Sequence, residues 1–244
     1  MLTALLVGVI GSSALVLGGA LGSYWKPARW VTGVFLAFAS GTLISALSFE
    51  LFPEAVELAG VLPSAIGLLV GAATFVVVSS WLDRRVAAGP GGPAGSAVGF
   101  ALLAAVTLDG VPENTALGVS LIASADLGIT AGSLALLFAI FASNFPEALV
   151  GAMSMRAAGR TARFAIGIWS IAAALLTVAV VVGFSALNGV NETALGFALA
   201  FAGGAVLASL ADTLMPEAFE RGKPAIALAT ALGFVIAFVL AEGL

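Results

Sequence analysis

Two short segments place acidic residues in the middle of long apolar stretches. They are residues 108–114 (LDGVPEN) and 142–148 (ASNFPEA), and each contains a Pro-Glu pair. An ionised carboxylate inside such a stretch is costly unless it contacts a partner, an ion or water, so it is a functional candidate by default. We therefore expect the function of the protein to lie in these two segments.

The spacing within each segment predicts a polar helix face. Asp109 and Glu113 are four residues apart, as are Ser143 and Glu147, and Asn144 precedes Glu147 by three. Side chains at these spacings lie about 5–6 Å apart on one face of a helix. If the two helices face each other, three carboxylates, an amide and a hydroxyl would surround a divalent metal, which would neutralise the carboxylates. The alternative is that the acids are protonated or hydrogen-bond across the helix bundle.

The prolines are expected to add backbone oxygens to the same place. Each proline lacks an N–H, so Pro112 should free the carbonyl of Leu108, and Pro146 that of Ala142. Unpaired backbone at membrane depth is tolerated only where it is buried in protein or lines a polar cavity. The prolines therefore favour a polar centre between the two helices.

The composition is that of a multi-pass helical membrane protein. The 244 residues are 61% hydrophobic and 9% charged, and they include no cysteine and no histidine. The apolar runs are continuous, whereas the strands of a β-barrel alternate apolar and polar positions. Without cysteine there is no disulfide framework and no thiolate metal site.

Apolar runs of about 20 residues, the length that crosses a bilayer, predict eight transmembrane helices in a single domain over residues 1–244. We place them near 2–22, 31–56, 62–82, 97–123, 128–155, 162–185, 193–218 and 224–243. The first has no basic residue before it, so it is interpreted as a retained span. The Gly/Pro-rich stretch at about 86–96 predicts a flexible linker. Asp126 and Asn191 are expected to cap the fifth and seventh helices.

The basic residues predict the orientation. All of them lie in alternate connections: Lys26 and Arg29; Arg84 and Arg85; Arg156, Arg160 and Arg163; Arg221 and Lys223. Since basic connections stay on the cytoplasmic side, both termini are expected to be extracytoplasmic, in the plasma (inner) membrane.

An internal repeat predicts the architecture. Residues 36–57 and 199–220 align without a gap and are identical at 11 of 22 positions. An odd number of crossings separates the second and seventh spans, so these two stretches would run through the membrane in opposite directions. Inverted repeats of this kind characterise many secondary transporters, whose substrate site lies near the midplane at the repeat interface. The fourth and fifth helices occupy that interface.

The two Pro-Glu segments resemble the paired H-N-x-P-E-G motifs on the fourth and fifth helices of the ZIP (Zrt/Irt-like) family of divalent metal-ion transporters. The resemblance covers essentially the whole chain. It implies an all-α fold in which helices 1–3 and 6–8 form inverted repeats around helices 4 and 5. It also implies metal movement toward the cytoplasm, a homodimer, and an elevator-like motion of helices 1, 4, 5 and 6 against helices 2, 3, 7 and 8.

Carried over residue by residue, the resemblance assigns a metal site to Asp109, Glu113, Ser143, Asn144 and Glu147. Asp109 and Ser143 stand where the family has histidines. Gly110 replaces a family asparagine, and Asn114 and Ala148 replace family glycines. The sixth span holds no acid, which favours one metal over two.

These features predict a transporter, or slow channel-like carrier, of divalent metal cations such as zinc, iron(II) or manganese. Glu50 and Asp212 lie within other spans and are candidates for the transport pathway. We expect no enzyme activity, no prosthetic group and no nucleic-acid partner. An intramembrane hydrolase is disfavoured because the G-x-G-D motif of aspartyl proteases of that kind is absent around Asp109 and because histidine-based zinc sites cannot form. A non-transporting metal sensor, a degenerate paralogue and a transporter of another cation remain as alternatives.

Overall fold

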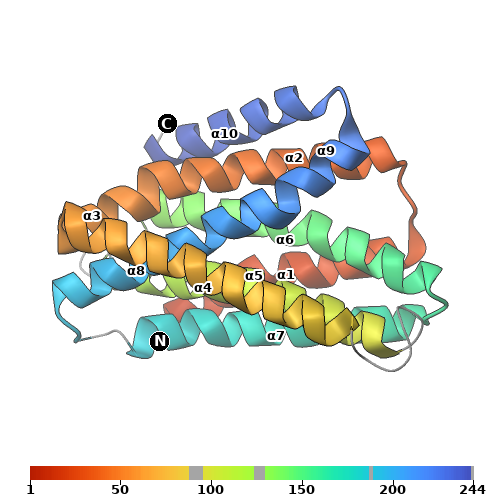
Figure 1. The fold of residues 1–244 in the computed structure, drawn as a ribbon, viewed down its shortest axis with the longest axis horizontal. Helices are drawn as coiled ribbons and strands as arrows, with labels where there is room; N and C mark the ends of the chain where they lie inside the picture. The colour runs from red at the N-terminus through yellow and green to blue at the C-terminus, as the bar shows by residue number, and fades with distance from the viewer. Residues whose placement is uncertain (88–95, 124–129, 187–188, 243–244) are drawn as a thin grey trace.

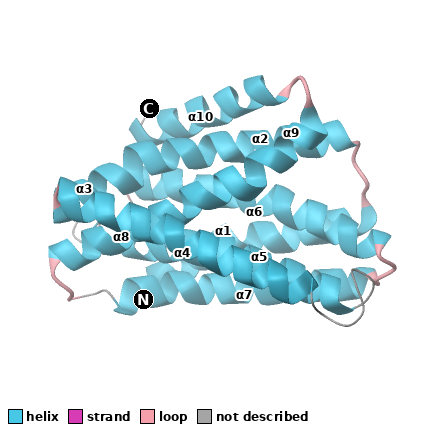
Figure 2. Cartoon of the chain, in the orientation of Figure 1, coloured by secondary structure: helices cyan, strands magenta, loops and turns pink. Residues whose placement is uncertain are grey.

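A computed structural model shows a bundle built of helices only, over the residues that it describes (Figures 1 and 2). It describes the backbone of residues 1–87, 96–123, 130–186 and 189–242. Within these ranges the side chains of residues 83, 85–87, 96–106, 108–109 and 123 are not described. Most of the linker predicted at 86–96 therefore lies outside the described residues.

The helices follow one another with short connections. They are α1 (Leu2–Tyr24), α2 (Arg29–Ala46), η1 (Leu47–Leu51), α3 (Phe52–Ala59), α4 (Val61–Ala87), α5 (Ser96–Ala123), α6 (Ala131–Ala157), α7 (Ala162–Ala186), α8 (Glu192–Ser209), η2 (Leu210–Leu214), α9 (Met215–Gly222) and α10 (Ile226–Glu242). Both η elements are π-helices that continue the helix before them into the helix after them.

Six helical runs in the described part of the chain are long and apolar enough to cross a membrane. They are α1, the α2–η1–α3 run, α4, α6, α7 and the α8–η2–α9 run. The α10 helix is equally apolar but has only 17 residues. This length and composition fit an integral, multi-pass membrane protein, so the predicted membrane class and helical fold agree with the structure.

Local sequence signals explain some helix ends and miss others. The Asn191 side chain caps α8 by accepting a hydrogen bond from the backbone N–H of Ala194 at 2.8 Å, as predicted. The prediction that Asp126 caps the fifth predicted helix, which is α6 in the structure, is wrong. Thr130 caps α6 and accepts from the N–H of Ser133 at 3.2 Å, while Asp126 lies outside the described residues.

The two π-helices were not predicted. Each ends one residue before the pair that opens the next helix, Phe52-Pro53 in one case and Met215-Pro216 in the other. A proline inside a helix has no N–H for the carbonyl four residues earlier, and its ring clashes with that carbonyl. A wider π turn relieves this conflict, and such turns are frequent at functional sites.

The repeat found in the sequence has the same secondary structure in both copies. Every bound of α8, η2 and α9 lies 163 residues beyond the matching bound of α2, η1 and α3, as Leu47 and Leu210 illustrate. The two runs also point in opposite directions along the bundle (Figure 1).

Each copy pairs with one further helix through reciprocal glycines. Between α2 and α10, a Cβ at Gly41 would overlap the carbonyl oxygen of Thr230, and one at Gly233 would overlap that of Phe38. Such glycines are needed because no side chain fits between the two backbones. Between α8 and α4, the same relation joins Gly204 to the carbonyl of Leu68 and Gly71 to that of Phe201. Both pairs are in extensive contact.

The two termini lie at the same end of the bundle, and the connections after α1, α6 and α9 lie at the other end (Figure 1). The described basic side chains are all exposed or half-buried and sit near that second end. We call the two ends the terminal end and the basic end.

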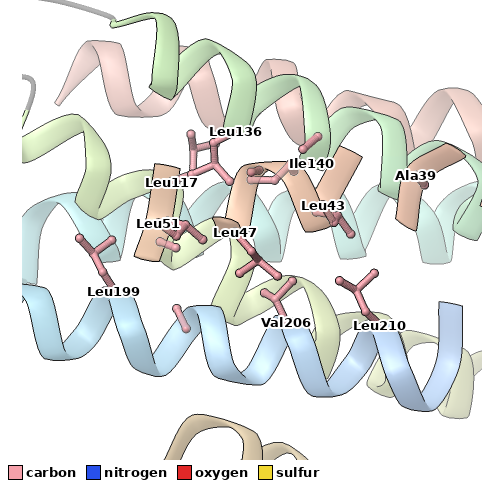
Figure 3. Close-up of a cluster of buried hydrophobic side chains, with 14 of the residues drawn as sticks. Ala39, Leu43, Leu47, Leu51, Leu117, Leu136, Ile140, Leu199, Val206 and Leu210 are labelled. Atoms are coloured by element: carbon pink, nitrogen blue, oxygen red, sulfur yellow. The ribbon is translucent and has the colours of Figure 1, made fainter. Parts of the chain in front are cut away.

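The largest apolar cluster of the described residues joins the two repeat copies to α5 and α6. These two helices contain the Pro-Glu segments, and we call them the motif helices. Figure 3 shows that the cluster draws side chains from α2 and η1, from α5 and α6, and from α8 and η2. Its labelled members are Ala39, Leu43, Leu47, Leu51, Leu117, Leu136, Ile140, Leu199, Val206 and Leu210. This core fixes α5 and α6 between the two repeat copies.

Candidate metal centre

The motif helices α5 and α6 contact each other, and each packs closely on one further helix. On α6, a Cβ at Gly18 or Gly22 of α1 would overlap the carbonyl oxygen of Phe145 or Leu149. On α5, Gly118 and Gly183 make the matching close approach between α5 and α7. The backbones of both motif helices thus approach a neighbouring helix closely next to the Pro-Glu segments.

Both helices continue through their prolines. Pro112 lies inside α5 and Pro146 inside α6, and the helical assignment is unbroken at either position. Neither proline therefore interrupts its helix. The carbonyls of Leu108 and Ala142 still cannot accept the usual helical hydrogen bond, because the residue four positions later is a proline, which has no N–H.

Four described polar side chains of the two segments are buried. The exposed fraction is 5% for Glu113, 0% for Asn114, 1% for Ser143 and 1% for Asn144. Glu147 is half-buried. The described side chains of the predicted polar faces therefore point wholly or partly into the bundle.

Hydrogen bonds hold three of these side chains in place. The amide nitrogen of Asn144 donates to the carbonyl of Gly11 in α1 at 3.4 Å, which links the second motif to α1. The Ser143 hydroxyl donates to the carbonyl of Ile140 at 3.0 Å, and the Asn114 amide donates to that of Gly110 at 2.9 Å.

Asn114 was not predicted as a site residue. Its Oδ1 is buried and, within the described residues, has no hydrogen-bond partner. A buried polar atom normally has a partner, so this oxygen is a further candidate donor atom for a cation. The signal in the sequence was the replacement of the family glycine at this position.

Gly110 has a steric explanation. It stands 34 residues before Asn144, at the matching motif position, but a Cβ there would lie 2.6 Å from a methyl carbon of Leu176 in α7. Asn144 instead faces Gly11 of α1, where its amide has room. The family asparagine would fit at position 110 only if Leu176 moved.

The complete predicted ligand set cannot be assembled from the described side chains. Asp109 lies in α5, but its side chain is not among them. Among the side chains that are described, no three His, Cys, Asp or Glu residues form a group that could hold a metal. What the structure describes of the predicted set is two acids, Glu113 and Glu147, on helices that contact each other, and three buried polar side chains on the same helices, Asn114, Ser143 and Asn144.

A second polar feature is an acidic cavity at the terminal end. It has a volume of about 890 Å³, and its wall includes Glu50 as well as Glu54, Glu57 and Glu192. Ser120 of α5 and Leu136 of α6 also line it, so it touches both motif helices. Of the two predicted pathway residues, the structure places only Glu50 here. Asp212 is exposed in η2 and does not line the cavity.

Neither the scan of protein-family models nor the search of curated proteins found a match to this chain.

Proposed function

We propose that this protein is a membrane carrier for divalent metal cations and that Glu113 and Glu147 hold the cation between α5 and α6. The observation that carries the proposal is the burial of Glu113 in the middle of α5, together with the burial of the amide and hydroxyl side chains of both Pro-Glu segments. Oxygen ligands of this kind suit hard divalent cations. Asp109, Ser143, Asn144 and Asn114 are the proposed supporting ligands.

The proposed architecture has eight crossings with an inverted repeat. Three observations support it: the constant offset of 163 residues between matching helix bounds, the opposite directions of the two runs, and the matched glycine pairs. In such transporters the two copies are related by a pseudo-two-fold axis in the membrane plane, and the site lies between them. The motif helices occupy this position in the bundle.

The acidic cavity is the proposed entrance. Clefts lined by charges of one sign raise the local concentration of counter-ions and so increase the rate of entry. Ser120 lines the cavity and is seven residues from Glu113 along α5, which corresponds to roughly 10 Å at 1.5 Å per residue. The distance from Leu136 to Ser143 along α6 is the same.

Apolar side chains separate this entrance from the site. Leu117 lies between Ser120 and Glu113 along α5, and Ile140 lies between Leu136 and Ser143 along α6. Both are fully buried and belong to the apolar cluster drawn in Figure 3. A cation cannot cross packed leucine and isoleucine without a rearrangement. This favours a carrier over a permanently open channel.

Uptake into proteoliposomes tests the proposal. The purified protein should move manganese, iron(II) or zinc inward, as measured with a fluorescent reporter trapped in the vesicles. Glu113→Ala should not, whereas Glu220→Gln, which alters an exposed acid of α9, should transport like the unmodified protein. Binding of metal without uptake would instead support a sensor, and uptake of protons alone would support a carrier of a different cation.

A further inference from the structure

An apolar groove lies on the outside of the motif helix α6, where α6 meets α2 and α10. Its volume is about 490 Å³, and every side chain that lines it is apolar. The lining residues are Val34, Phe35 and Phe38 of α2, Phe141, Ala142, Phe145 and Pro146 of α6, and Ala225, Leu228, Ala229 and Leu232 at the start of α10.

The surroundings of the groove are apolar too. Leu228 and Leu232 are 79% and 56% exposed, and both belong to a helix whose sequence is apolar throughout. In a membrane these side chains meet lipid hydrocarbon, so the groove opens to acyl chains and excludes water. A polar ligand would find no hydrogen-bond partner among its lining side chains.

One end of the groove reaches the basic end of the bundle. Ala225 follows Lys223 by two residues, and Val34 follows Arg29 by five, which is about 7.5 Å along α2. Both Arg29 and Lys223 are exposed. The Lys223 ammonium lies 3.5 Å from the centroid of the Phe219 ring, so its charge is not neutralised, whereas Arg221 forms an ion pair with Glu217 at 2.7 Å.

The charges at this end have an excess of positive sign. Six charged residues lie next to the groove mouth in sequence, in the connection between α1 and α2, at the start of α2, in α9 and in the connection after α9. They are Lys26, Arg29, Glu217, Glu220, Arg221 and Lys223. Four are basic and two are acidic. A phosphate lying at the mouth of the groove would therefore be attracted.

We propose that the groove binds one acyl chain of an anionic phospholipid, with the phosphate of its headgroup at Arg29 and Lys223. The groove runs from Ala225 to Leu232 along α10, about 10 Å, which accommodates the upper half of an acyl chain. Apolar walls next to exposed basic side chains match the two parts of such a lipid. Basic side chains near the membrane surface favour anionic headgroups by about fivefold each.

This lipid would touch the motif helix itself. Phe145 and Pro146 line the groove, whereas their neighbour Asn144 is buried and donates to Gly11 on the inside of the bundle. Phe145 also packs edge-to-face on Phe35 of α2, with ring centroids 6.1 Å apart. The acyl chain thus contacts the outer side of the helix that carries the polar centre on its inner side. The proposal does not depend on what the protein transports.

Native mass spectrometry of the purified full-length protein tests the headgroup contact. Phosphatidylglycerol and phosphatidylcholine with identical chains are titrated in parallel, and the lipids that remain bound are counted. We expect a several-fold preference for phosphatidylglycerol. The double variant Arg29→Gln/Lys223→Gln should lose most of this preference, and the matched variant Arg84→Gln/Arg163→Gln, which removes two exposed charges at the same end, should keep it.

Filling the groove tests the acyl-chain contact. Ala142→Phe should reduce the number of retained lipids by one, while Ala73→Phe on the exposed face of α4 should not. Leu232→Trp, at an exposed groove position, serves the same purpose if Ala142→Phe does not fold.

Three results would overturn the proposal. They are equal retention of the two lipids by the unmodified protein, equal losses in the two charge variants, and unchanged lipid counts in a folded groove-filling variant. Efficient disulfide cross-linking between copies of Leu232→Cys in membranes would also overturn it, because a second copy of the chain would then cover the groove.

Discussion

The carboxylate of Glu50 rests directly on Gly132, so that a Cβ at position 132 would overlap its Oε2. Glu50 belongs to π-helix η1 in the first repeat copy, and Gly132 belongs to the first turn of the motif helix α6. The absence of a side chain at one residue of α6 therefore allows an acid of the neighbouring helix to sit in the wall of the acidic cavity. This contact links the proposed entrance to the proposed site.

Gly132→Ala should displace the Glu50 carboxylate and slow metal uptake by about tenfold below saturation, since the acidic wall raises the local cation concentration. Stability should not fall, because the overlapping atom ends a flexible side chain and alanine favours a helix over glycine by about 1 kcal/mol. Uptake rate and thermal unfolding measure the two effects. Gly167→Ala, with no atom within 4 Å of its new methyl group, is the matched control. Equal uptake in both variants would show that the position of Glu50 does not matter.

Glu113→Ala and Glu147→Ala should each abolish transport while the protein remains folded and inserted in the membrane. Each removes an anionic ligand from a site that depends on the balance of charge. Uptake assays on purified protein, with circular dichroism and size-exclusion chromatography as checks of folding, measure this. Uptake at the unmodified rate in both variants would refute the proposed centre.

The Asn114→Leu variant tests whether Asn114 binds the cation or has only a structural role. The buried Oδ1 of Asn114 has no partner among the described residues, and an unsatisfied buried polar atom destabilises a fold by about 1–3 kcal/mol. A leucine has the same number of side-chain heavy atoms and no polar atom, so it should maintain or raise the midpoint of thermal unfolding without metal. If Oδ1 binds the cation, the extra stabilisation on adding manganese should shrink in the variant. The same metal-induced shift in both proteins would exclude Asn114 from the site.

Labelling of single cysteines should show that the termini and the linker lie on opposite sides of the membrane. The chain has no native cysteine, so Leu2→Cys and Ser96→Cys provide unique labels. An impermeant thiol reagent added to whole cells should modify the first and spare the second, as the positions of the basic residues predict. Modification of both from the same side would contradict the proposed topology and the inverted repeat with it.

The sequence predicted the helices well because their signal is local. Each apolar run identified a helix to within a few residues, and the cap at Asn191 needed only its own neighbours. The cap at Thr130 was missed because Asp126, five residues before α6, has an equally suitable side chain. The π-helices were missed because a proline in an apolar run was treated as part of a continuous span.

The candidate centre was predicted only in part, for a different reason. Glu113, Ser143 and Asn144 were expected on inward faces from their spacing, and all three are buried. The acidic cavity combines residues of η1, α3 and the start of α8, which are distant in the sequence. No spacing rule places Glu57 near Glu192, because only the packing of α3 on α8 brings these helices together.

The metal preference should differ from that of ZIP transporters with motif histidines, which the two Pro-Glu segments resemble, because Asp109 and Ser143 stand at the histidine positions of those motifs and would supply oxygen. Imidazole suits zinc, whereas carboxylate, carbonyl and hydroxyl oxygens suit manganese and magnesium. Zinc also accepts carboxylates and outcompetes manganese at most sites of one type, so the expected change is relative. Asp109→His with Ser143→His should raise the affinity for zinc relative to manganese if both side chains contact the ion.

Competition binding on the purified double variant measures this ratio. The pH must be fixed, since imidazole binds metal only in its deprotonated form. Thr177→His, at a half-buried position of α7 outside both motifs, controls for adventitious zinc binding by a new histidine. A zinc-to-manganese ratio equal to that of the unmodified protein would mean that positions 109 and 143 do not contact the cation. The ligand assignment based on the family resemblance would then be wrong, even if Glu113 and Glu147 proved essential.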